Sequence, residues 1–186
     1  MSGVRLLACA PTPALRAAVF GGDGEPDEAG LRATQSLAGQ RGLTADVPWL
    51  CGGSVAATAT ARALGRAATA VPALADPDFG RWSGATLETV AARDPAAVQA
   101  WLTDPGAAPH GGESLAAVAA RVGAWLHGPA QGPVVAVAHP VVVRAAVACA
   151  LGLPAAALWR LDVAPLALVR LTCRAGRWHL HLPTAA

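Results

Sequence analysis

The sequence predicts an α/β fold, a three-layer sandwich with a mostly parallel central sheet. Short apolar runs bounded by Gly or Pro alternate with Ala-rich segments of helical periodicity, and the connections between them are short. Such alternation is typical of strands joined by crossover helices, which pair in parallel. The 186 residues include 54% hydrophobic and 14% charged side chains, so we expect one domain over residues 1–186 with a large core.

The first half of the chain supplies two strands and two helices before a loop-rich section over residues 71–84. The predicted elements are a strand over Val4–Ala8, a helix over Asp27–Gln40, a strand over Ala45–Cys51 and a helix from Ser54 to about Gly65. Acidic residues in the first turn favour the first helix, and the Ser54 hydroxyl can cap the second.

The second half predicts three further strands and four helices. They are helices over Ala85–Arg93 and Pro95–Leu102, a helix after "GGES", a strand over Pro133–Ala138, a helix from His139-Pro140 to about Leu151, and strands over Pro165–Leu171 and Arg177–Leu182. In such sheets the ligand crevice lies at the carboxyl ends of the strands. Cys9 and His139 each follow a predicted strand, so both are expected at that edge.

Composition narrows the function classes. A formal charge of +2 and eight scattered aromatic residues give little support for binding nucleic acid. The longest apolar stretch, around residues 134–153, is interrupted by His139, Pro140 and Arg144, so no membrane span is expected. The N-terminus lacks a signal-peptide pattern, and four dispersed cysteines form no C-x-x-C pair. We expect a cytoplasmic protein without metal or other cofactor, whose apolar content allows a homodimer.

Four stretches then follow one another over nearly the whole chain. They are "RLLACAPT" at the first strand, "SVAATATARALG" in the second helix, "DPDFGRWSG" in the loop section, and "GGESLAAVAARV" followed by "VVAVAHPVVVRAAV". In this order the chain resembles the histidine phosphatase superfamily, whose fold is that of the phosphoglycerate mutases. The resemblance implies the same three-layer fold.

The resemblance also implies an active site of defined chemistry. One His accepts the phosphoryl group, two Arg and a second His neutralise its oxygens, and a carboxylic acid protonates the leaving group. By the resemblance, Asp76 takes the acid position and His139 the second His position. Cys9 stands where the nucleophilic His is expected, and Ala8 and Ala56 stand where the two phosphate-binding Arg are expected.

Loss of both Arg is the strongest indication against phosphoryl transfer. One lost charge-assisted contact costs about 2–4 kcal/mol of transition-state stabilisation, so two should cost about three decades or more in rate. Arg16 or Arg81 are candidate substitutes, Arg81 being nearer to the rim of the family's active site; alternatively each is a solvated loop residue. Glu113 either supports the first turn of its helix or faces the pocket. His110, in a Gly-rich loop, is expected to be exposed.

Cys9 has three interpretations. It is a small residue in a loop that has lost its function, or a nucleophile whose thiolate is favoured by His139, or a metal ligand together with His139 and Asp76. With Asp76 orienting His139, the second interpretation gives a Cys-His-Asp arrangement suited to acyl transfer or hydrolysis. His139 itself is either functional or a structural link between a strand and a helix.

The leading hypothesis is a pseudoenzyme, a hydrolase-like chain that lacks ordinary phosphohistidine catalysis and binds a small molecule or a partner. The alternatives are an enzyme of changed chemistry that uses Cys9, His139 and Asp76, and a residual phosphomonoesterase that uses Arg16 or Arg81. Whether the chain is an enzyme is left open at this point.

Overall fold

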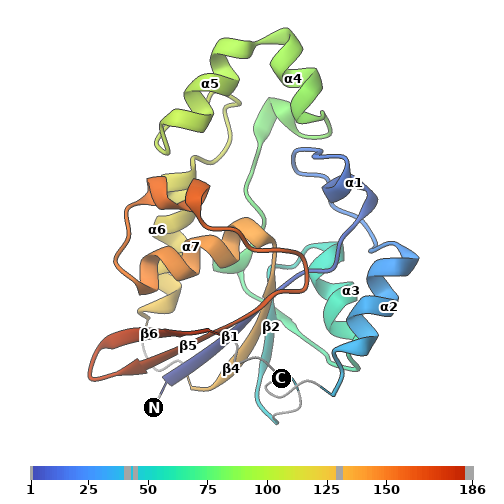
Figure 1. Cartoon of the computed structure of the whole chain (residues 1–186), viewed down its shortest axis with the longest axis vertical. Helices are drawn as coiled ribbons and strands as arrows, with labels where there is room; N and C mark the ends of the chain where they lie inside the picture. The colour runs from blue at the N-terminus through green and yellow to red at the C-terminus, as the bar shows by residue number, and fades with distance from the viewer. Residues whose placement is uncertain (1, 40–42, 44–45, 129–131, 183–186) are drawn as a thin grey trace.

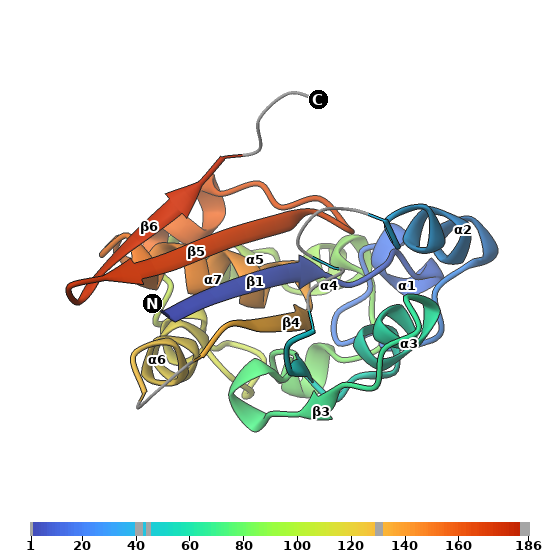
Figure 2. The same cartoon turned by 90° about the horizontal axis from the view of Figure 1, so that it is seen from below.

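The central sheet carries the strand order β3-β2-β4-β1-β5-β6 (Figures 1 and 2). The computed structural model describes residues 2–39, 43, 46–128 and 132–182. The strands are β1 (Ser2–Ala8), β2 (Trp49–Cys51), β3 (Thr69–Ala70), β4 (Val134–Ala138), β5 (Leu168–Arg174) and β6 (Arg177–His181). The first four are parallel, whereas β5 and β6 are antiparallel to their neighbours, which confirms the mostly parallel sheet.

The two central strands end side by side. The register pairs Val4 with Val134 and Ala8 with Ala138, and the Cys9 N–H continues the ladder by donating to the carbonyl of Ala138 at 2.9 Å. Because β1 and β4 are parallel and in step, the residues that follow them emerge at the same edge of the sheet. Cys9 and His139 are therefore brought together by the topology, as predicted.

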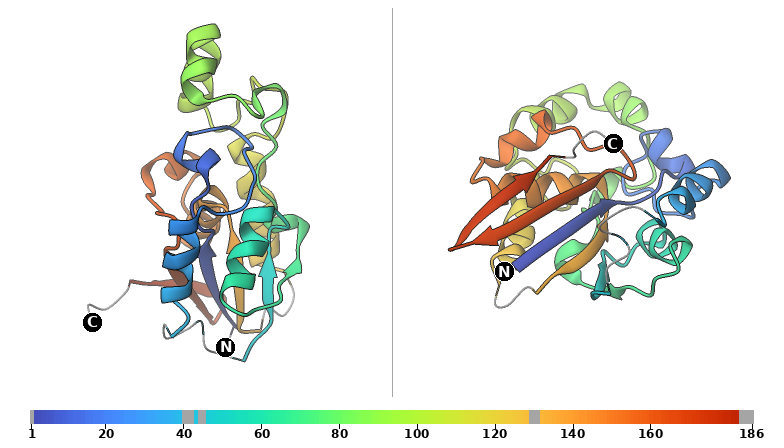
Figure 3. Two further views of the ribbon diagram at one scale, coloured as in Figure 1. Left: turned by 90° about the vertical axis from the view of Figure 1, so that its right-hand side faces the viewer. Right: turned by 60° about the horizontal axis from the view of Figure 1, so that its bottom comes forward.

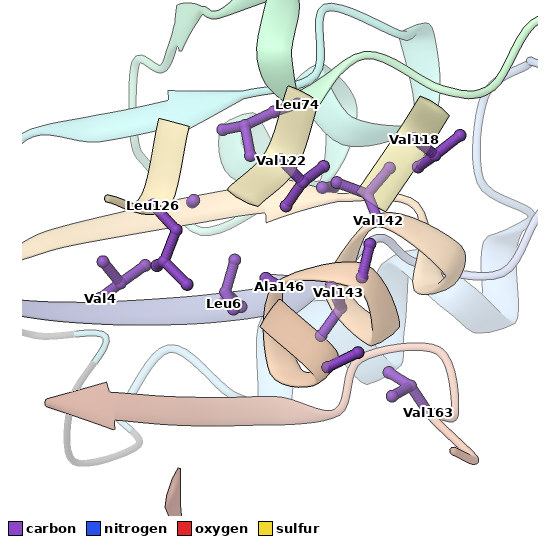
Figure 4. Close-up of a cluster of buried hydrophobic side chains, with 14 of the residues drawn as sticks. Val4, Leu6, Leu74, Val118, Val122, Leu126, Val142, Val143, Ala146 and Val163 are labelled. Atoms are coloured by element: carbon purple, nitrogen blue, oxygen red, sulfur yellow. The ribbon is translucent and has the colours of Figure 1, made fainter. Parts of the chain in front are cut away.

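Helices cover both faces of the sheet and make the three layers. On one face α6 (Leu115–Leu126) and α7 (Pro140–Ala150) pack against alternate residues of β1, including Val4 and Leu6. Figure 4 shows Val4 beside Leu126 and Leu6 beside Ala146. On the other face, α3 (Val55–Ala63) covers a second cluster that contains Leu7 and Cys9. The side chains of β1 thus alternate between two cores, as the two-residue period of a strand requires. The helix α2 (Glu28–Ser36) lies beside α3 (Figure 1).

A helical cap stands above the carboxyl ends of the parallel strands. It is formed by α4 (Leu87–Arg93) and α5 (Pro95–Thr103), drawn in green, and projects away from the sheet (Figures 1 and 3). Its own core is aromatic, with Phe20, Trp82 and Trp101 buried together. None of the helices in the described part of the chain has the length and apolar character that crossing a membrane would need.

Two loops below the cap fit closely because each offers a glycine. The Arg81 N–H donates to the carbonyl of His110, and the Glu113 N–H donates to that of Asp78. A Cβ at Gly80 would collide with the backbone at His110, and one at Gly112 would collide with that of Asp78. The "DFG" and "GGES" motifs therefore form one continuous wall beneath the cap.

Most element boundaries agree with the sequence prediction, and the differences have local causes. The helix expected over Asp27–Gln40 ends at Ser36, with Asp27 as its N-cap. The strand expected from Pro165 begins at Leu168, because Leu166 adopts a left-handed turn conformation with φ of 63°. The N-caps Ser54 and His139 are as expected. His110 is buried, not exposed, with its ring packed against Phe79 and Trp82.

Candidate active site

A cavity of about 200 Å³ lies at the carboxyl ends of β1 and β4, below the cap. Its polar lining includes Cys9, His139 and Asp76, which the sequence had singled out, and Asp23, which it had not. The rest of the wall is mostly apolar; its larger side chains are Leu15, Val19, Phe20, Phe79, Leu87 and Trp101. Three groups dispersed over 130 residues of sequence therefore share one pocket.

Cys9 is held at the base of the cavity as a neutral thiol. The loop after β1 is fixed by the Ala10 N–H, which donates to the buried hydroxyl of Thr60 in α3 at 2.9 Å. Burial, followed by the charges of Asp76 and Asp23, raises the pKa of Cys9 to about 12. The thiol is therefore protonated at neutral pH. This shift counts against the expectation that the loop favours the thiolate.

His139 is the N-cap of α7 and is neutral. Its Nδ1 accepts a hydrogen bond from the Val141 N–H at 3.3 Å, which leaves the ring proton on Nε2. Burial, with the nearby positive charge of Arg144, lowers the pKa of His139 to about 4. The structural interpretation of His139 is supported, because its ring joins the strand to the helix. The ring also lines the cavity, so a functional role stays a prediction.

Asp76 carries a carboxyl group that resists ionisation. Burial is the main cause and the charge of Asp23 the next, and together they raise its pKa to about 6, although the Ser54 hydroxyl and the Arg121 charge act in the opposite direction. Its Oδ1 atom is buried without a hydrogen-bond partner. In the described structure no hydrogen bond joins Asp76, His139 and Cys9, so the Cys-His-Asp arrangement shares a cavity without being assembled.

Asp23 is the site residue that the sequence analysis missed. Its carboxylate accepts hydrogen bonds from the N–H groups of Val55 at 2.7 Å and Ala56 at 3.0 Å, the first residues of α3. A helix N-terminus is a natural anion site, and here the chain fills it with its own carboxylate. Ala56, which stands at an Arg position by the resemblance, lines the cavity next to this group. Ala8 does not: it is buried in the core on the side of α6 and α7.

The candidate substitute cations do not reach the cavity. Arg16 pairs with Asp27, with 2.6 Å between Nε and Oδ2, and lines a neighbouring groove of about 440 Å³ instead. Arg81 is mostly exposed and lies 3.7 Å from Asp94. The expectation that either replaces the lost Arg is therefore not supported by their positions. Among the described lining residues of the cavity, none is Arg.

Glu113 also has a structural position. It precedes α6, whose N-cap is Ser114, and accepts two hydrogen bonds from Arg121, at 2.7 and 2.9 Å. Arg121 donates in addition to the carbonyls of Ala73 and Ala75, both at 2.8 Å. Glu113 therefore ties the loop before Asp76 to α6, and it is absent from the described lining of the cavity.

Metal binding finds no basis in the described residues, where no group of three or more His, Cys, Asp and Glu side chains is arranged to hold an ion. The metal-ligand interpretation of Cys9 therefore gains no support from this part of the chain. The cavity offers instead two carboxyl groups, a neutral imidazole, a thiol and aromatic surface.

A parallel sheet whose central strands end at a capped cavity is typical of α/β proteins that hold their ligand at the carboxyl ends of the strands. The model of the histidine phosphatase superfamily (branch 1) matches residues 35–185. The chain belongs to this superfamily, as its motifs had indicated.

Solved structures agree with this assignment. A mycobacterial glucosyl-3-phosphoglycerate phosphatase in complex with VO3 superposes with a TM-score of 0.83 at 27% identity, over 100% of both chains. The alpha-ribazole phosphatase of Shigella flexneri gives a TM-score of 0.85 at 20% identity, over 97% of this chain and 95% of its own, which is a likeness of fold.

A curated relative, a bifunctional protein of Mycobacterium tuberculosis, is 38% identical over 111 residues, or 55% of this chain and 30% of the relative. The chain thus matches less than a third of that protein's length.

Proposed function

We propose that this member of the superfamily is a pseudoenzyme that binds a small organic ligand in the cavity and does not catalyse phosphoryl transfer. The observation that carries the proposal is the charge of the pocket, which contains Asp23 and Asp76 and, among its described lining residues, no Arg. A phosphate dianion needs fixed positive charge or several converging donors. Here it would meet two carboxyl groups.

The individual catalytic roles are also unfilled. A neutral thiol stands at the position of the nucleophile, since burial raises the pKa of Cys9 to about 12. His139 is neutral, whereas the family's second His supplies charge. The N–H groups at the start of α3 already bind Asp23. Each of these departures lowers the affinity for the transition state, and together they support a loss of several decades in rate.

The test is a phosphomonoesterase assay with p-nitrophenyl phosphate, with the mycobacterial phosphatase as positive control. We expect no turnover above a no-protein blank, and no change for His139→Ala or Asp76→Asn. We also expect orthovanadate at millimolar concentration to leave the melting temperature unchanged. Turnover that disappears in His139→Ala would overturn the proposal.

A second candidate is an enzyme of changed chemistry with Cys9 as nucleophile, and one observation favours it: Cys9, His139 and Asp76 line the same cavity. The raised pKa of the thiol counts against it. Alkylation by iodoacetamide, followed by peptide mass spectrometry, separates the two. The proposed pseudoenzyme requires Cys9 to react more slowly than the half-buried Cys149 and Cys173, whereas a nucleophile would react far faster than both.

A further inference from the structure

The two carboxyl groups of the cavity lack a cationic partner. Asp23 accepts hydrogen bonds from the backbone N–H groups of Gly24, Val55 and Ala56, and in the described structure it forms no ion pair. Asp76 likewise has no ion pair there, because Arg121, the cation that acts on it, is engaged by Glu113 and two carbonyls. Asp23 is exposed and Asp76 is partly buried, and both line the cavity, so a cation that enters it meets two carboxyl groups without a cationic partner.

An unused acceptor points in the same direction. The Oδ1 atom of Asp76 is buried and has no hydrogen-bond partner in the structure. A buried carboxylate oxygen left without a donor costs free energy, so the protein itself satisfies the ionised form of Asp76 incompletely. A metal ion is a poor candidate for a cation at this site, because the described residues offer no group of three suitable ligands.

The wall of the cavity suits an apolar body attached to that charge. Phe20 and Trp101 meet edge to face with 5.3 Å between ring centroids, and Phe79 lies 5.1 Å from Phe20. All three rings line the cavity, as do Leu15 and Leu87. Aromatic surface next to carboxylates is the usual environment of a bound organic ammonium ion, because ring faces attract cations and exclude anions.

We propose that the cavity selects a protonated organic amine, whose N–H groups donate to Asp76 and Asp23 and whose apolar body packs against Phe20, Phe79 and Trp101. This inference rests on the proposed ligand-binding function and names the ligand class of the same pocket. The pocket of a phosphate-binding fold has, in this chain, the opposite charge preference.

The test compares three probes of similar size by isothermal titration calorimetry near neutral pH: 2-phenylethylamine, 2-phenylethanol and 3-phenylpropionate. The amine is a cation under these conditions, the alcohol is neutral and the acid is an anion. We expect the amine to bind at least about tenfold more tightly than the alcohol, and the anion not to bind. Asp23→Asn and Asp76→Asn should each lower the affinity for the amine by about tenfold and leave the affinity for the alcohol unchanged. Asp46→Asn is the matched control, because Asp46 is exposed and outside the cavity lining.

The outcomes separate this inference from the proposed function. Equal affinities for amine and alcohol overturn the cation preference and leave a ligand-binding pocket. Tighter binding of the anion overturns the cation preference as well. Failure of all three probes at millimolar concentration also counts against the inference, whereas phosphatase turnover in the same preparation overturns the pseudoenzyme itself. Because the asparagine variants keep the side-chain shape, loss of folding is checked independently by their melting temperatures.

Discussion

Replacing Asp76 by Asn should stabilise the protein at neutral pH, although it removes a group from the site. The pKa of Asp76 is raised from 3.8 to about 6 by burial and by Asp23. That difference corresponds to about 3 kcal/mol, which we reduce to about 2 kcal/mol because the side chain is partly exposed. Between these pH values the folded chain retains a proton that the unfolded chain has lost, so the free energy of unfolding falls as the pH rises.

The assay is urea unfolding of both proteins at about pH 4 and at pH values above 6. Asn does not ionise, so the variant should exceed the parent by about 2 kcal/mol at pH 7, or roughly 4–8 °C in melting temperature, and the advantage should vanish near pH 4. The Asp46→Asn control should show no comparable gain. A variant that is less stable than the parent at pH 7, or a difference that does not depend on pH, would refute the reasoning.

Three further predictions concern the same region. The affinity for 2-phenylethylamine should rise as the pH increases through about 6, because Asp76 then loses its proton while the amine stays charged; calorimetry across this range tests it, and a flat profile would contradict it. The imidazole of His139 should titrate near pH 4, because burial disfavours its charged form. NMR of its ring protons measures this, and a midpoint near the ordinary value of 6.5 would contradict the prediction. Arg121→Ala should destabilise the fold by about 3 kcal/mol, because it breaks a half-buried ion pair with Glu113 and leaves two carbonyls without a donor. Urea unfolding measures this change. A loss below about 1 kcal/mol would mean that the ion pair contributes no more than an exposed surface pair.

The parts of the site that the sequence predicted are those that depend on local pattern. An apolar strand followed at once by Cys9 or His139 places both residues at the carboxyl edge, because β1 and β4 run parallel in step. Ser54 and His139 were predicted as residues at helix starts, since a cap acts over three or four positions of sequence.

Asp23 was missed because its partners are distant in sequence. It caps α3 from 32 residues away, from a Gly-rich loop in which an acidic residue resembles any solvated turn residue. The same limit applies less strongly to Glu113, whose partner Arg121 lies eight residues further along the chain, and to Arg16, whose partner Asp27 lies eleven residues further along. The sequence did hold a signal for Asp23. It is an acidic residue between the first two family motifs, and in both of these motifs Ala stands where a phosphate-binding Arg is expected.

Open cavities and unpaired carboxylates both reduce the stability of a fold. A chain that served only as a scaffold would gain free energy by closing the pocket or by replacing Asp76 with a neutral residue, since a buried Oδ1 without a donor and a neighbouring carboxylate at Asp23 both oppose folding. Strained or charged groups that the rest of the structure tolerates are most often found at binding and catalytic sites. Under the proposed function, phosphoryl transfer does not account for them, because Cys9 is protonated and the described lining of the cavity contains no Arg. A ligand that supplies the missing positive charge accounts for the cavity, for its aromatic wall and for its cost to stability at the same time.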